Sequence, residues 1–70
     1  MTKEHIERIS HLLEMMESAE IYAGAEFEAL CNDGNYLESE IFYMIRDVLK
    51  AQRAVINDYF SIKQGDTHDN

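Results

Sequence analysis

The feature that most constrains this chain is the single place where its helical pattern is interrupted. The sequence contains no proline, and its three glycines are Gly24, Gly34 and Gly65. Only one interior cluster of turn residues occurs, the segment 32–35 with the sequence Asn-Asp-Gly-Asn. Because Gly34 suits the left-handed conformation that closes a helix, we predict two long helices joined by one tight turn.

Signals at the helix ends set the expected boundaries. Thr2 is the expected N-cap of the first helix, and Asn35 with Glu38 three residues later forms a capping-box-like pattern before the second. The C-terminal segment has no large apolar residue to bury, so we expect it to be a disordered tail. The predicted organisation is one hairpin domain over residues 1–63, with helices at about 3–32 and 36–63, a turn at 33–35 and a tail at 64–70.

Apolar residues on the second predicted helix cover about half of its circumference when they are placed at 100° per residue. A hairpin of two helices can cover only one stripe on each helix, so part of this arc has no partner within the chain. A second protein surface must therefore cover it. The residues expected to form this dimer or partner interface are Phe42, Ile45, Leu49, Gln52, Ile56 and Phe60.

A second copy of the chain is the simplest cover. A chain of 70 residues hides only about 60% of the surface of its unfolded form, and small scaffolds usually need extra support. Cys31 is the only cysteine, so an intrachain disulfide cannot supply that support. We therefore expect an all-α antiparallel hairpin that forms a homodimeric four-helix bundle, with Glu20 and Gln52 as the polar positions in its seam. The alternatives are a different protein partner and a monomer with a partly exposed second helix.

Charged residues flank the apolar arcs and suggest a register. If the turn centres on Gly34, the numbers of facing residues sum to about 67. Exposed ion pairs contribute at most about 1 kcal/mol each, so they select the orientation more than they stabilise it. The pairs expected from this register are Glu14 with Arg53, Glu17 with Lys50, and Arg8 with Asp58.

Negative charge gathers near the turn. No Lys or Arg occurs between residues 9 and 45, so the carboxylates of this stretch lack nearby basic neighbours in the sequence. Such an acidic tip could dock a basic protein surface or imitate the phosphates of a nucleic acid, and it could also be a solvated helix end that aids solubility. The residues of the acidic tip are Glu26, Glu28, Asp33, Glu38 and Glu40.

Composition argues against several functions. Fourteen acidic and six basic residues give a formal net charge of −8, which repels nucleic acid phosphates, so we expect no direct DNA or RNA binding. The apolar runs are too short for a bilayer, and a cytoplasmic protein is expected. His11 has Glu7 and Glu14 at helical spacing, which chance explains on a helix rich in Glu. We therefore expect no catalytic site, cofactor or metal.

The outline of a helical hairpin that would dimerise resembles the plasmid-encoded, RNA-binding Rop proteins. The resemblance implies only the four-helix bundle. Rop function depends on polar and basic residues along the first helix, whereas this chain carries Glu7, Glu14, Glu17 and Glu28 there. Our first hypothesis is a non-catalytic interaction module or adaptor that docks a basic protein. The alternatives are an inhibitor that mimics nucleic acid and occupies a DNA-binding protein or nuclease, and a small chaperone for a secreted helical protein.

Overall fold

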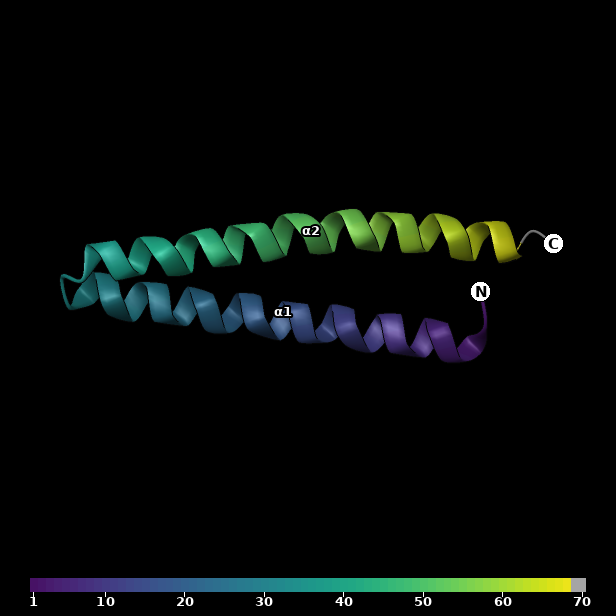
Figure 1. Cartoon of the computed structure of the whole chain (residues 1–70), viewed down its shortest axis with the longest axis horizontal. Coiled ribbons are helices and arrows are strands. Elements are labelled where there is room, and N and C mark those ends of the chain that lie inside the picture. The colour runs from purple at the N-terminus through teal and green to yellow at the C-terminus, as the bar shows by residue number, and fades with distance from the viewer. Residues whose placement is uncertain (69–70) are drawn as a thin grey trace.

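The chain folds as two antiparallel helices that lie side by side (Figure 1). A computed structural model describes the backbone of residues 1–68 and the side chains of residues 1–62. Helix α1 spans Lys3–Asn32 and helix α2 spans Tyr36–His68. The two termini lie at one end and the turn at the other, in a rod with principal extents of 55 × 17 × 11 Å. The predicted helical hairpin is confirmed.

Both ends of α1 are closed by local hydrogen bonds. The Thr2 side chain accepts a hydrogen bond from the His5 backbone N–H at 3.2 Å, as expected for an N-cap. At the other end, the Gly34 N–H donates to the Cys31 carbonyl at 3.1 Å and the Asn35 N–H donates to the Leu30 carbonyl at 2.8 Å. This pair of bonds defines a Schellman motif, and Gly34 takes the left-handed conformation that it requires, with φ of 80°.

The start of α2 differs from the expected capping box. The Asn35 backbone carbonyl accepts from the Ser39 N–H at 3.0 Å, and the Ser39 hydroxyl donates to the Tyr36 carbonyl at 2.8 Å. No side-chain cap from Asn35 or Glu38 closes this end in the part of the chain that the structure describes. The backbone of α2 also continues past the predicted end at residue 63 to His68. The expected tail at 64–70 is therefore helical through His68, and residues 69–70 lie outside the described residues.

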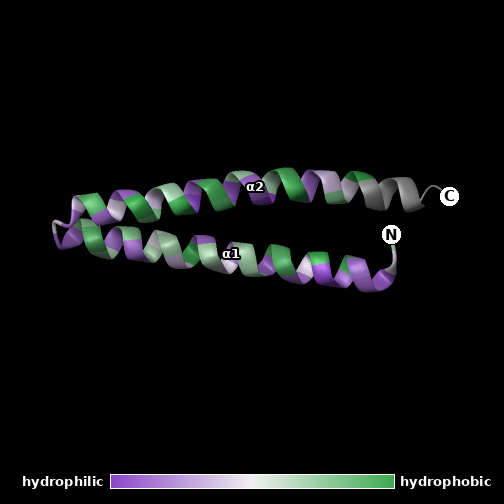
Figure 2. Cartoon of the chain, viewed as in Figure 1, coloured by the Kyte–Doolittle hydropathy of each residue, from purple (hydrophilic) through white to green (hydrophobic). Residues whose placement is uncertain are grey.

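The contact between the helices contains few buried residues. Ala23 is 4% exposed, and Ser39 and Glu20 are the buried polar residues of the described part of the chain. No large side chain there is fully buried, although polar and apolar bands alternate along both helices (Figure 2). Gly24 belongs to the same contact, because a Cβ at this position would lie 3.5 Å from Cδ of Arg46. The hairpin thus closes through small residues rather than through a large apolar core.

The register differs from the one expected from the charges. Arg53 contacts Glu20 and Glu17, not Glu14, and Arg8 lies 3.7 Å from Glu4 on its own helix. The expected pairs of Glu14 with Arg53, Glu17 with Lys50, and Arg8 with Asp58 are not formed in the described part of the chain. Numbers of facing residues sum to 70 for Phe27 with Tyr43 and to 73 for Glu20 with Arg53. Residues 36–38 are exposed, and Ser39 is the first residue of α2 that is buried against α1. The pairing of facing residues is therefore shifted from the one that a turn centred on Gly34 would give.

Candidate functional site

One edge of the contact between the helices carries a carboxylate–guanidinium pair. Arg53 donates from Nε to Oε2 of Glu20 and from Nη2 to Oε1 at 3.2 Å, which is a two-pronged arrangement. Glu17 adds a longer contact to Nη1 of Arg53 at 3.9 Å. Glu20 was expected to be a polar position in a seam between subunits, but its carboxylate is already paired within the hairpin.

The pair shifts the titration of Glu20. The hydrogen bond from Arg53 lowers the pKa of Glu20 below its usual value, against the opposite effect of burial. The carboxylate therefore stays ionised at neutral pH, as the contact with Arg53 requires. This charge pair closes one edge of the hairpin.

A second basic residue lies across the helices closer to the turn. The Arg46 guanidinium carbon is 5.0 Å from the centroid of the Tyr43 ring and 5.9 Å from that of Phe27. The two rings are themselves 5.4 Å apart and tilted by 51°. Gly24 leaves the space in which the Arg46 side chain lies. Arg46 thus brings a positive charge toward a region that appeared purely acidic in the sequence.

The broad side of the hairpin that lies away from the Glu20–Arg53 pair is apolar and open. Between α1 and the middle of α2 lies a groove of about 490 Å³ whose lining contains no charged residue. A second groove, of about 410 Å³, continues it toward the chain termini and is equally free of charge. We call these grooves together the apolar face. Its lining residues are Met1, Ile9, Leu12, Leu13, Met15, Met16, Ala19, Leu49, Val55, Ile56, Tyr59 and Phe60.

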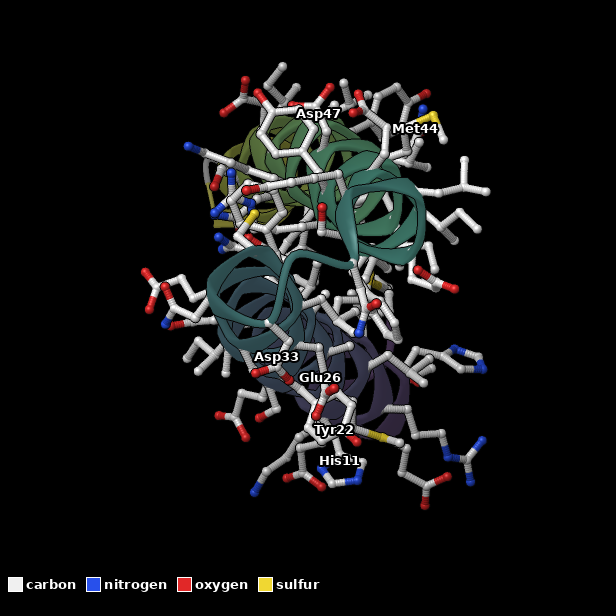
Figure 3. The ribbon with its side chains drawn as sticks, turned by 90° about the vertical axis from the view of Figure 1, so that its left-hand side faces the viewer. His11, Tyr22, Glu26, Asp33, Met44 and Asp47 are labelled. Carbon is white, nitrogen blue, oxygen red and sulfur yellow. The ribbon has the colours of Figure 1, made fainter. Side chains whose placement is uncertain are left out.

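Apolar exposure extends from this face around the back of α2. Figure 3 looks along the hairpin from its turn end and shows Met44 and Asp47 on the side of α2 that lies away from α1. Large apolar residues recur along that side at helical spacing, and each has 48 to 77% of its surface exposed. We call this row the outer stripe. It consists of Leu37, Ile41, Met44, Val48, Val55, Tyr59 and Ile62.

The six residues predicted to form the interface fall into two groups. Phe42, Leu49 and Phe60 are half-buried within the hairpin. Ile45 and Ile56 are more exposed, and the Gln52 side chain is also exposed. None of the six is fully enclosed within one chain. Leu49, Ile56 and Phe60 all line the apolar face.

Sequence reasoning placed the outer stripe within the wide arc but did not select it as the uncovered part. The reason is the rotation of α2 about its own axis. Ser39, Arg46 and Arg53 lie along the line that faces α1, so the apolar arc is displaced to one flank and to the back of the helix. A signal for this rotation was present, because the three residues are spaced by seven.

The acidic tip residues surround the turn end rather than forming one patch. Glu26 is half-buried and lies on the side of α1 away from α2, whereas the other four are exposed (Figure 3). Glu26 and Glu28 are two residues apart on one helix, so their side chains leave it about 200° apart, and the same holds for Glu38 and Glu40. These four carboxylates therefore point in different directions around the turn end.

The histidines of α1 lie on its surface. The Thr2 hydroxyl is 3.0 Å from Nδ1 of His5. His11 borders a shallow depression of about 550 Å³ together with Glu7 and Arg8. Within the described residues, no group of three or more His, Cys, Asp or Glu is placed to hold a metal ion, and Cys31 is half-buried and unpaired.

Comparisons with known proteins gave no match to a family model, to a curated protein or to a solved structure. In the described part of the chain, neither helix has a stretch that is both long and apolar enough to cross a bilayer. The properties of the apolar face are therefore the main guide to function.

Proposed function

We propose that the protein is a non-catalytic protein–protein interaction module that pairs with a second copy through its apolar face to form a four-helix bundle. The observation that carries this proposal is the apolar face itself. Its grooves contain no charged lining residue, and it adjoins a row of exposed apolar side chains on α2. Large uncovered apolar areas of this kind mark binding surfaces in soluble proteins.

The accessible surface supports the proposal quantitatively. One chain exposes 5547 Å², whereas a compact monomer of this mass exposes about 4,500 Å². The excess of about 1,000 Å² is similar to the roughly 800 Å² that each partner buries in a stable interface. The radius of gyration, 16.0 Å against about 11 Å for a compact chain of this length, points the same way.

The distribution of charge favours a second copy as the partner. In a two-fold dimer the same patch faces itself, so a charge close to the axis would meet its own copy. The linings of both grooves lack charged residues, and the Glu20–Arg53 pair lies at another edge of the contact between the helices. Two copies can therefore bring their apolar faces together despite a net charge of −8 each. A reducing compartment such as the cytoplasm would suit the unpaired thiol of Cys31.

Sedimentation equilibrium at micromolar concentration tests the proposal. We expect twice the mass of the 8.2 kDa chain, and a monomer at 100 µM would contradict the proposal. Leu12 and Ile21 provide a matched pair of variants, because both are exposed on α1 and lie nine residues apart, on opposite sides of the helix. Leu12→Glu should weaken association at least tenfold, while Ile21→Glu should leave it unchanged.

The acidic tip is proposed to contact a basic partner of the dimer. Its exposed carboxylates surround the turn end, and Arg46 is engaged with the rings of Phe27 and Tyr43. Binding to an immobilised basic peptide should weaken with added salt and with Glu38→Gln and Glu40→Gln. Binding that ignores both changes would leave the tip with a role in solubility alone.

The same grooves would also fit an amphipathic helix of another protein, as in the chaperone hypothesis. Met15 and Met16 in the lining favour this alternative, because thioether side chains adapt to differently shaped partners. Purification of the tagged chain from its native cell separates the two functions. A stable one-to-one complex with a helical protein would support the chaperone, and recovery of the homodimer alone would argue against it.

A further inference from the structure

We propose that the two copies of the chain pair head to tail, with α1 crossing α1 of the second copy between Met15 and Met16 and with the two turns at opposite ends of the dimer. The proposal rests on the homodimer proposed above and uses the same apolar face. Two observations carry it. Charge is distributed unevenly along the hairpin, and the half-buried carboxylate of Glu26 has no ion pair within the described residues.

A two-fold dimer that joins the apolar faces has two orientations. If the axis runs along the helices, α1 lies against α2 of the second copy and both turns lie at the same end. If the axis runs across the helices, each helix lies against its own copy and the turns lie at opposite ends. Both orientations bring the grooves of the two copies together, so the charges must select between them.

The two ends of the hairpin differ in charge. Residues 26–40 contain five carboxylates and no Lys or Arg, whereas residues 1–8 contain Lys3 and Arg8 beside two carboxylates. Packed helices lie about 8–10 Å apart, which is close to the screening length of about 8–10 Å near physiological ionic strength. Turns at the same end would therefore bring two acidic tips into mutual repulsion. Turns at opposite ends place each tip beside the basic residues of the second copy.

One line of side chains on α1 gives the register. His5, Leu12, Ala19 and Glu26 follow one another at intervals of seven, so each is turned by only about 20° from the one before. Leu12 and Ala19 line the apolar face, and Glu26 lies on the side of α1 away from α2 (Figure 3). This line therefore runs along the α1 border of the apolar face, where a second copy of α1 would pack.

The proposed crossing pairs unlike side chains along this line. The numbers of facing residues sum to 31, so Leu12 meets the smaller Ala19 of the second copy, and His5 meets Glu26 of the second copy. A register one heptad longer would bury Glu26 against Leu12. A register one heptad shorter would leave Glu26 without a facing residue on α1. Only the crossing between the two methionines combines apolar contact with a basic neighbour for Glu26.

Glu26 gains two basic neighbours in this register. The Thr2 hydroxyl accepts from the His5 backbone N–H and lies 3.0 Å from Nδ1, so its own proton is available to Nδ1 and the ring can donate from Nε2. Arg8 follows His5 by about one turn, and its contact with Glu4 is exposed. Because burial disfavours an unpaired carboxylate, the second copy supplies what one chain lacks.

The distance between the two turns tests the orientation. In a Cys31→Ser background, a spin label at Asn32→Cys lies about 25 Å from the crossing along α1, at a rise of 1.5 Å per residue. Head-to-tail pairing therefore places the two labels about 50 Å apart, whereas turns at the same end place them within about 20 Å. Pulsed electron paramagnetic resonance measures this distance. A dimer with the shorter distance would overturn the head-to-tail arrangement alone, and a wild-type monomer in sedimentation would remove the homodimer as well.

Charge reversal tests the register. Glu26→Lys should weaken association about fivefold, because it places a like charge beside His5 and Arg8 in both halves of the dimer. His5→Glu should have a similar effect, and the double variant should recover the wild-type affinity. Glu28→Lys is the matched control, since it changes the net charge equally but its side chain leaves α1 about 200° from that of Glu26. Equal weakening by the control, or no recovery in the double variant, would overturn the register.

Discussion

The half of the hairpin next to the turn and the half next to the termini are held together differently. Near the turn, Ala23 and Ser39 are buried, and Arg46 spans the rings of Phe27 and Tyr43. Toward the termini, the side chains between the helices line open apolar grooves instead. The difference indicates that one chain completes the packing of only the turn half. The proposed second copy would cover the terminal half.

The largest effect is expected in the terminal half. Leu49→Asp places a carboxylate in the lining of the apolar face, so association should weaken by at least about 100-fold, or about 2.7 kcal/mol. Ala54→Asp is the control, because Ala54 is exposed and lies about 140° around α2 from Leu49. Sedimentation equilibrium measures both. Equal association of the two variants would remove the distinction between the halves.

In the turn half, overpacking should destabilise the fold of the hairpin. Ala23 is 4% exposed, so Ala23→Leu forces extra methyl groups into a closed contact and should lower the free energy of unfolding by about 1–3 kcal/mol. Ala25→Leu, at an exposed position of the same helix, should change it little. Urea unfolding at a fixed protein concentration checks both. A tolerated Ala23→Leu would show that the turn half is as open as the terminal half.

The two glycines of the turn half should respond in opposite directions to alanine. Gly34→Ala places a Cβ in the left-handed region and should cost about 1–2 kcal/mol. Gly24→Ala should gain about 0.5–1 kcal/mol in helix propensity, because its Cβ would meet only the flexible Arg46 side chain at ordinary contact distance. Thermal unfolding of the two variants gives the comparison, and a loss in Gly24→Ala would mean that Arg46 cannot move aside.

The smallest effect concerns the ion pair at the boundary between the halves. The folded-state pKa of Glu20 is lowered, so the pair stabilises the fold above the ordinary value near 4.5, and this contribution is lost as the pH falls through the lowered pKa. Wild type should therefore exceed Glu20→Gln in Tm at pH 7, and the difference should shrink below pH 4.5. A difference in Tm that is independent of pH would contradict the role of the Glu20 carboxylate.

The sequence by itself determined the two helices and the turn. Thr2 and Gly34 act through hydrogen bonds to residues within a few positions along the chain, so their effect can be read locally. The end of α2 was predicted too early, because the polar composition of residues 64–68 did not stop the backbone from continuing as a helix to His68. The apolar excess on α2 was also evident, since it follows from the periodicity alone.

Only the tertiary structure decided which part of that excess stays uncovered. The expected pairing of Glu14 with Arg53 gave way to Glu20, because Arg53 turns inward and places the rest of α2 in a different rotation. Such a rotation depends on which side chains reach across to the other helix, and periodicity within one helix does not contain that information. The outer stripe became distinct from the apolar face only once the two helices were placed against each other.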